Sequence, residues 1–81
     1  MKLTYGVPLW VMKKYLTDLG ATEVEENVLV GDRWQAVVSK SDPAIIGPMV
    51  VGRIELELSG DEATIEALLS QLHWKTLRGG G

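Results

Sequence analysis

The sequence contains no cysteine and only one histidine, His73. The absence of cysteine excludes a disulfide framework, thiol catalysis, and zinc or iron-sulfur sites that use cysteine ligands. A single histidine cannot form a metal site built from histidines alone, and any Ser-His-Asp arrangement would depend on this one imidazole. Because His73 is predicted where the second helix ends, a position that favours a cation, we assign it a helix-end or surface role and not a catalytic one.

Clustered basic residues and long apolar runs are also scarce. The net charge is −3, and the basic groupings are limited to Lys13-Lys14 and to Lys75 with Arg78. A nucleic-acid partner is therefore not expected. No segment approaches the ~20 apolar residues that span a bilayer, and the apolar run near the N-terminus is broken by Gly6 and Pro8. A cytoplasmic location without a membrane partner is predicted.

Phosphate-binding loops and convincing catalytic pairs are missing as well. The glycines are scattered as turn and cap residues and match neither common phosphate-loop pattern. Glu55 and Glu57 share one face of a predicted strand, a spacing typical of a solvated face. We therefore predict no cofactor, no metal site and no enzymatic activity.

The clearest pattern is a strand followed directly by a helix. From residue 50 to residue 58, Ile54, Leu56 and Leu58 alternate with charged residues, as in a strand with one buried face. The next residues, 59–61, form a turn with good N-cap chemistry. A helical stripe follows at Ile65, Leu68, Leu69 and Leu72.

The rest of the chain, most of it before this unit, predicts another helix and several short strands. After a strand at 2–5, Pro8 is expected as the first residue of a helix that ends at Gly20. Residues 28–30 and 34–38 predict a hairpin. In the loop after it, Ile45-Ile46 should return to the core. The other expected elements are a helical face of Leu9, Val11, Met12, Tyr15, Leu16 and Leu19, a strand at 22–24, a turn at 25–27 and a last short strand at 74–78.

This order predicts an α+β two-layer sandwich in which an antiparallel sheet carries two helices on one face. Eighty-one residues suffice for one domain with a modest core. We assign residues 1–78 to a single domain and residues 79–81 to a flexible glycine tail. The helix directly after the first strand distinguishes this order from the ubiquitin fold, which opens with a hairpin.

Trp10 interrupts the polar side of the first helix, where it lies beside Lys13 and Lys14. One interpretation is that a loop or the N-terminal strand covers it, since Trp is usually highly buried. The other is that Trp10 is an exposed anchor for a protein partner, because Trp is favoured at interface hot spots. Trp10, Lys13 and Lys14 are therefore the candidate partner-binding residues.

The chain ends in Arg78-Gly79-Gly80-Gly81, and two interpretations of this end are open. Glycines beyond the last element can simply be a frayed end. Alternatively, a tail without side chains can thread a narrow active site and present its carboxylate to ATP for adenylation. Leu77-Arg78-Gly79-Gly80 is similar to the end of ubiquitin-type carriers, although a third glycine follows here.

Several stretches of the chain carry a family resemblance. They are Tyr5-Gly6, Pro8-Leu9-Trp10, Tyr15-Leu16, Gly20, Gly47, residues 54–63 and residues 78–81. Together they resemble the C-terminal domain of MoaD-related proteins, which join a ubiquitin-like domain to this second domain. The resemblance implies a TATA-binding-protein-like topology with a curved antiparallel sheet and two helices. It does not imply DNA binding, because this chain is acidic.

The main hypothesis is a non-catalytic accessory or interaction domain, linked to molybdopterin cofactor biosynthesis or sulfur transfer. Its partner would be a protein, such as a carrier-activating enzyme or a molybdopterin-pathway protein. One alternative is a carrier whose Gly81 carboxylate is adenylated and thiocarboxylated. Another is a small-molecule-binding domain on the concave side of the sheet, with Trp34 among the lining residues. Open sheet edges are also compatible with a homodimer.

Overall fold

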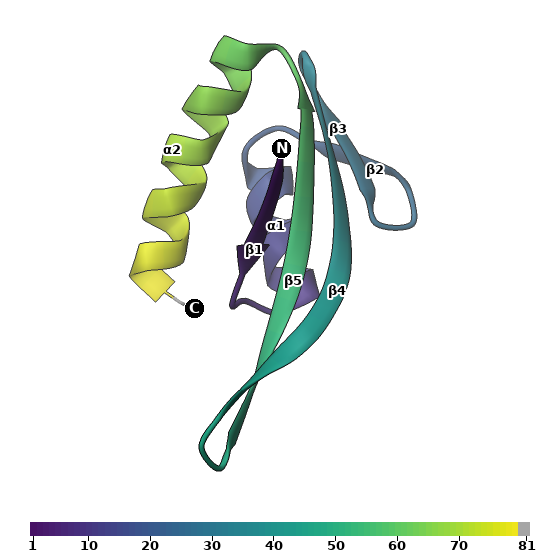
Figure 1. The fold of residues 1–81 in the computed structure, drawn as a ribbon. Coiled ribbons are helices and arrows are strands. Elements are labelled where there is room, and N and C mark those ends of the chain that lie inside the picture. Colours follow the sequence, from purple (N-terminus) through teal and green to yellow (C-terminus); the bar gives the residue numbers. More distant parts are fainter. Residues whose placement is uncertain (80–81) are drawn as a thin grey trace.

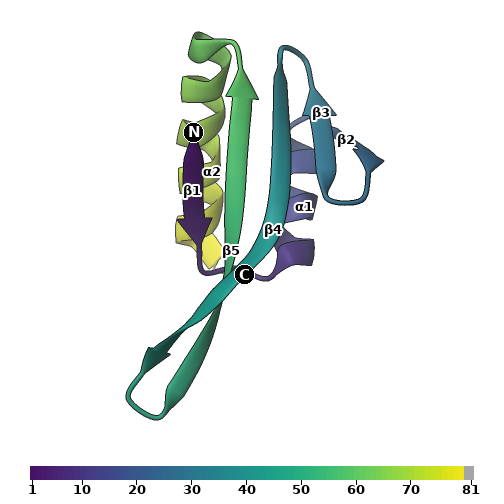
Figure 2. The same ribbon diagram turned by 45° about the vertical axis from the view of Figure 1, so that its right-hand side comes forward.

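A computed structural model describes residues 1–79 as one five-stranded antiparallel sheet with two helices. The strands lie in the order β1-β5-β4-β3-β2. Both helices pack on the same face of the sheet, which curves along β4 (Figures 1 and 2). The elements are β1 Lys2–Tyr5, α1 Leu9–Asp18, β2 Thr22–Glu25, β3 Val28–Gly31, β4 Trp34–Ile46, β5 Met49–Gly60 and α2 Glu62–Gly79.

This arrangement confirms the predicted α+β two-layer sandwich. The order of elements is β-α-β-β-β-β-α, as the implied topology requires. None of the described helices is both long enough and apolar enough to cross a membrane.

The alternation in β5 places its apolar side chains under the helices, as predicted. Leu56 pairs with Val38 of β4, and Leu58 pairs with Ala36, and all four side chains are buried. Directly paired residues point to the same face of a sheet, so two neighbouring strands present one continuous apolar surface. The core continues through α1 and α2, with Met12, Leu16, Ile65, Leu68 and Leu72 among its members.

The first helix follows its predicted face and ends as expected. Gly20 has a φ of +107°, and its N–H donates to the Thr17 carbonyl at 3.0 Å. The Ala21 N–H donates to the Leu16 carbonyl at 3.0 Å, which completes a Schellman cap. At the other end Pro8 is extended, with a ψ of 152°, so it is the N-cap and not the first helical residue.

Two tight turns connect β2, β3 and β4. Asn27 and Arg33 both have positive φ, 64° and 68°, and each lies in a two-residue connection between paired strand ends. A positive φ at this place gives a turn whose twist matches that of the strands. The predicted hairpin is confirmed, and its second strand continues well beyond Val38.

The second helix is longer than predicted. Asp61 caps it, accepting hydrogen bonds at Oδ2 from the Thr64 N–H at 3.0 Å and the Thr64 hydroxyl at 2.8 Å. The helix then runs without interruption to Gly79, so the predicted last strand at 74–78 is wrong. His73 likewise lies within the helix and not at its end.

The extended part of this helix makes contacts with the first helix. Lys75 lies 3.8 Å from an oxygen of Asp18 and 5.6 Å from the ring centroid of Tyr15. The Thr76 hydroxyl bonds the Leu72 carbonyl one turn earlier at 3.0 Å. The β-favouring Trp and Thr in this segment are outweighed by tertiary packing, which routinely overrides local propensity.

The segment that links β4 and β5 also differs from expectation. Instead of a loop folded onto the core, β4 and β5 stay paired as far as Ile46 and Met49, with Gly47-Pro48 as the turn. A register shift between Ser41 and Ala44 marks where the hairpin bends. Ile45 and Ile46 are strongly exposed, so the prediction that they return to the core is wrong.

Candidate functional site

The first turn of α1 and the base of the β4–β5 hairpin enclose an open hollow of about 730 Å³. We call it the Trp10 hollow, because Trp10 stands at its rim with 69% of its surface exposed. The covered interpretation of Trp10 is therefore wrong. Trp10 is exposed, and its role as an anchor for a partner stays a prediction. The hollow combines apolar and cationic side chains, among them Val7, Leu9, Val50, Ile54, Lys40 and Arg53.

The charges that line the hollow favour an anionic ligand. Lys40 and Arg53 both line it, and none of the acidic residues in the described part of the chain does. Among the described residues neither cation forms an ion pair, although Arg53 Nε lies 3.4 Å from the Asp42 carbonyl oxygen. Sequence reasoning missed these two cations, because they approach α1 only through the pairing of β4 with β5.

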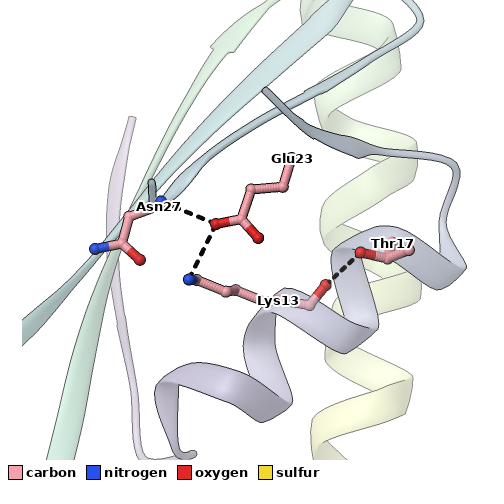
Figure 3. A network of polar contacts seen from close by, with 4 residues as sticks. All are labelled: Lys13, Thr17, Glu23 and Asn27. Carbon is pink, nitrogen blue, oxygen red and sulfur yellow. Dashed lines mark hydrogen bonds and ion pairs between the residues drawn. The ribbon is translucent and has the colours of Figure 1, made fainter. Parts of the chain in front are cut away.

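The structure separates the two lysines that were predicted beside Trp10. Lys13 Nζ lies 3.0 Å from Glu23 Oε2, and the same oxygen accepts the Asn27 N–H at 3.0 Å (Figure 3). These contacts tie α1 to the β2–β3 turn. The Asn27 hydrogen bond, followed by the Lys13 contacts, lowers the pKa of Glu23. Lys13 is thus engaged within the fold, whereas Lys14 is exposed next to Trp10.

The Thr17 hydroxyl also donates to the Lys13 carbonyl oxygen at 2.8 Å, which adds one more local contact to this side of α1 (Figure 3). Such a bond to the carbonyl of residue i−4 is the usual way in which a threonine within a helix satisfies its hydroxyl locally. On the polar side of α1, Lys13 and Thr17 therefore make contacts within the protein. Trp10 and Lys14 are the members of this side that remain open to a partner.

Trp34 does not fit the predicted ligand-binding role. It is only 6% exposed and belongs to the core, where its indole stacks against the backbone of Gly31 too closely for any side chain there. It does not line the Trp10 hollow, nor the smaller hollow beside Met1 and Ile65. Trp34 belongs to the core between the sheet and the two helices, which explains why it is buried.

The glycine tail is only partly within the described residues. The sequence predicted that a flexible tail begins at Gly79. Gly79 is instead the last residue of α2. Gly80 and Gly81 lie outside the described residues. The carrier hypothesis, which depends on these glycines, stays a prediction.

The remaining carboxylates and His73 are possible metal ligands or catalytic groups within residues 1–79. Glu55 lies 3.8 Å from Lys2, and Glu57 is exposed, as a solvated strand face predicts. No group of three or more His, Asp or Glu side chains in this range is placed to hold a metal ion. His73 makes an edge contact with Trp74, with ring centroids 6.4 Å apart.

The fold and this surface define a small α+β domain with an exposed tryptophan beside a cationic hollow. A family model, described as archaeal MoaD-like protein, matches residues 2–81. The chain therefore belongs to the archaeal MoaD-like family, which agrees with the resemblance noted in the sequence. A search of curated proteins found no match.

Proposed function

We propose that this chain is a non-catalytic interaction domain that binds a protein of molybdopterin cofactor biosynthesis or sulfur transfer. The observation that carries the proposal is Trp10, a large aromatic side chain that stands 69% exposed at the rim of a hollow. An exposed Trp beside a concavity is the arrangement in which interface hot spots occur. Membership of the archaeal MoaD-like family supports the metabolic context.

The chemistry of the hollow specifies what the partner should present. Apolar walls from Leu9 and Ile54 suit an apolar side chain, whereas Lys40 and Arg53 suit a carboxylate next to it. Exposed Lys14 extends the positive charge along α1. The partner segment should therefore pair an apolar anchor with an acidic residue or a terminal carboxylate, because complementary charge at a rim governs specificity and association rate.

Calorimetric titration with purified candidates, a sulfur-carrier protein and its activating enzyme, tests this proposal. Trp10→Ala should weaken binding at least tenfold, since truncated hot-spot residues cost about 2 kcal/mol or more. Lys14→Glu should weaken binding and reduce its salt dependence.

Trp74→Ala is the matched control, because Trp74 is 63% exposed on α2, away from the hollow. It should bind as the wild type does. Equal affinities for the Trp10→Ala and Trp74→Ala variants would refute the assigned surface. The absence of binding to every candidate would refute the proposed link to molybdopterin cofactor biosynthesis or sulfur transfer.

A second candidate function, the adenylated carrier, is favoured by one finding. The family match extends to residue 81, so Gly79, Gly80 and Gly81 lie within the matched segment. In this function the terminal carboxylate attacks the α-phosphate of ATP and releases pyrophosphate. A sulfur donor then displaces AMP to leave a thiocarboxylate.

Intact mass spectrometry after incubation with an activating enzyme, ATP and a sulfide donor distinguishes the two functions. A carrier gains the mass difference between sulfur and oxygen, and deletion of Gly80 and Gly81 abolishes the gain. An unchanged mass, together with binding that depends on Trp10, supports the interaction domain.

A further inference from the structure

The β4–β5 hairpin extends beyond the rest of the sheet as a two-stranded arm (Figures 1 and 2). We define the arm as residues 44–51. The neighbouring strands stop before it: β1 pairs with β5 only from Ile54 to Glu57, and β3 pairs with β4 only from Trp34 to Val37. Within the described sheet, therefore, no strand pairs with either outer edge of the arm.

Large apolar side chains occupy both faces of the arm. Ile45 is paired with Val50, and Ile46 with Met49. Because successive residues point to opposite faces, the first pair lies on one face and the second pair on the other. All four side chains are strongly exposed, from 62% at Met49 to 77% at Ile45. Neither helix covers the arm, so folding of a single chain leaves this apolar surface in water.

The composition of the arm indicates what can cover it. No charged residue occurs from Pro43 to Val51. Two identical arms can therefore approach without repulsion between like charges, and nothing in the arm selects for an oppositely charged partner. Contiguous exposed apolar surface of this kind marks an interaction site.

The residues at the base of the arm are compatible with the same occupant. Lys40 and Arg53 are cationic, Asp42 is anionic, and none of the three forms an ion pair among the described residues. A two-fold axis places the same patch on both sides of an interface. When two arms cross in opposite directions about such an axis, the acidic and basic groups of one base can face those of the other. The arm is thus self-complementary in hydrophobicity, and its base carries groups of both signs.

We propose that the arm is a self-association element, and that a second copy of this chain covers it. In the resulting two-fold dimer the arms of the two copies pack against each other and bury Ile45, Ile46, Met49 and Val50. This contact does not involve Trp10 or Lys14, although Val50 of the arm and Lys40 and Arg53 at its base also line the Trp10 hollow.

Sedimentation velocity and light scattering at tens of micromolar protein test the proposal. The wild type should have twice the monomer mass of 8.9 kDa. The double variant Ile46→Lys/Met49→Lys should have the monomer mass. The matched control, Val24→Lys/Val30→Lys, adds the same charge at exposed valines of β2 and β3 and should stay dimeric.

A second variant removes the arm without touching the core. Replacing residues 42–52 with Asn-Gly closes the hairpin at the paired residues Ser41 and Arg53. This variant should be monomeric and retain the circular dichroism of the wild type. Trp10→Ala should stay dimeric while it loses partner binding. Unchanged partner binding by this dimeric variant would refute the proposed function and not the arm contact.

Two results would overturn the proposal: a monomeric wild type, or a dimer that persists in both arm variants. Co-sedimentation with vesicles of phosphatidylglycerol and phosphatidylcholine then identifies a different occupant. A monomer that binds these vesicles through Ile46 and Met49 would replace the second copy with a lipid surface.

Discussion

Gly60 shows how much one residue contributes where β5 turns toward α2. Its φ is +137°, and a Cβ at this position would overlap the Arg33 carbonyl oxygen. The Asp61 N–H donates to the same Arg33 oxygen at 2.9 Å, so the backbone cannot move away without losing this bond. Glycine is therefore required here for both conformation and space.

Gly60→Ala should destabilise the protein by roughly 1–3 kcal/mol, the cost of holding a non-glycine residue in a rare backbone conformation. Urea unfolding followed by circular dichroism measures the change. Gly52→Ala is the control, since its φ is unexceptional and its Cβ would meet nothing within 4 Å. Equal unfolding midpoints for the two variants would contradict the assigned constraint.

The three tryptophans show what a residue's neighbours in the sequence leave undetermined. Trp10, Trp34 and Trp74 are all large and amphipathic, yet Trp34 is buried and the other two are exposed. The polar neighbours of Trp10 in the first helix left its exposure as one of two interpretations, and Trp10 is exposed. Trp34 is buried because strand pairing aligns it with the inner face of the sheet. Trp74 is exposed although Leu68 and Leu72 of the same helix are buried.

Among the elements, α2 depends most clearly on one cap. Hydrogen bonds from the Thr64 hydroxyl and then from its N–H lower the pKa of Asp61. A pKa that is lower in the folded state means that the carboxylate stabilises the protein above the pKa of the unfolded chain. This stabilisation is lost as the pH falls through the folded-state pKa.

Asp61→Ala should therefore lower the urea midpoint at neutral pH, and the gap from the wild type should narrow as the pH falls below about 4. Unfolding curves between pH 7 and pH 2.5 measure this gap. Glu62→Ala, which also removes one acid from the first turn, serves as the comparison and lacks the cap bonds. A gap that stays constant with pH would argue against the cap.

The turns between β2, β3 and β4 were predicted from the sequence, whereas the β4–β5 arm was not. The turns at Asn27 and Arg33 follow local turn chemistry, so their positions were predicted from neighbouring residues. The arm was not predicted, because Pro43, Gly47 and Pro48 are typical of a loop. Pairing of β4 with β5 overrides that composition, with a register shift at Pro43 and the turn at Gly47-Pro48.

For the whole molecule, stability depends on the layer between the sheet and the two helices. Leu56 lies at the centre of this layer, fully buried and paired with Val38. The chain is short, so it has little surplus core to absorb a cavity.

Leu56→Ala should cost about 2–5 kcal/mol, the range for large-to-small changes in a packed core. Val37→Ala, on the outer face of β4 and 37% exposed, should cost less than about 1 kcal/mol. Thermal and urea unfolding of both variants check the difference. Similar losses would show that the two faces of the sheet are not distinguished as described.

The sequence by itself determined the layers of this protein, the faces of both helices and the solvent side of β5. These follow from periodicity and caps, which are set by residues within a few positions of one another. Only the tertiary structure decided the length of α2, the two-sided arm and the meeting of Lys40 and Arg53 with Trp10. Each of these depends on segments far apart in the chain, whose packing energy no local pattern encodes.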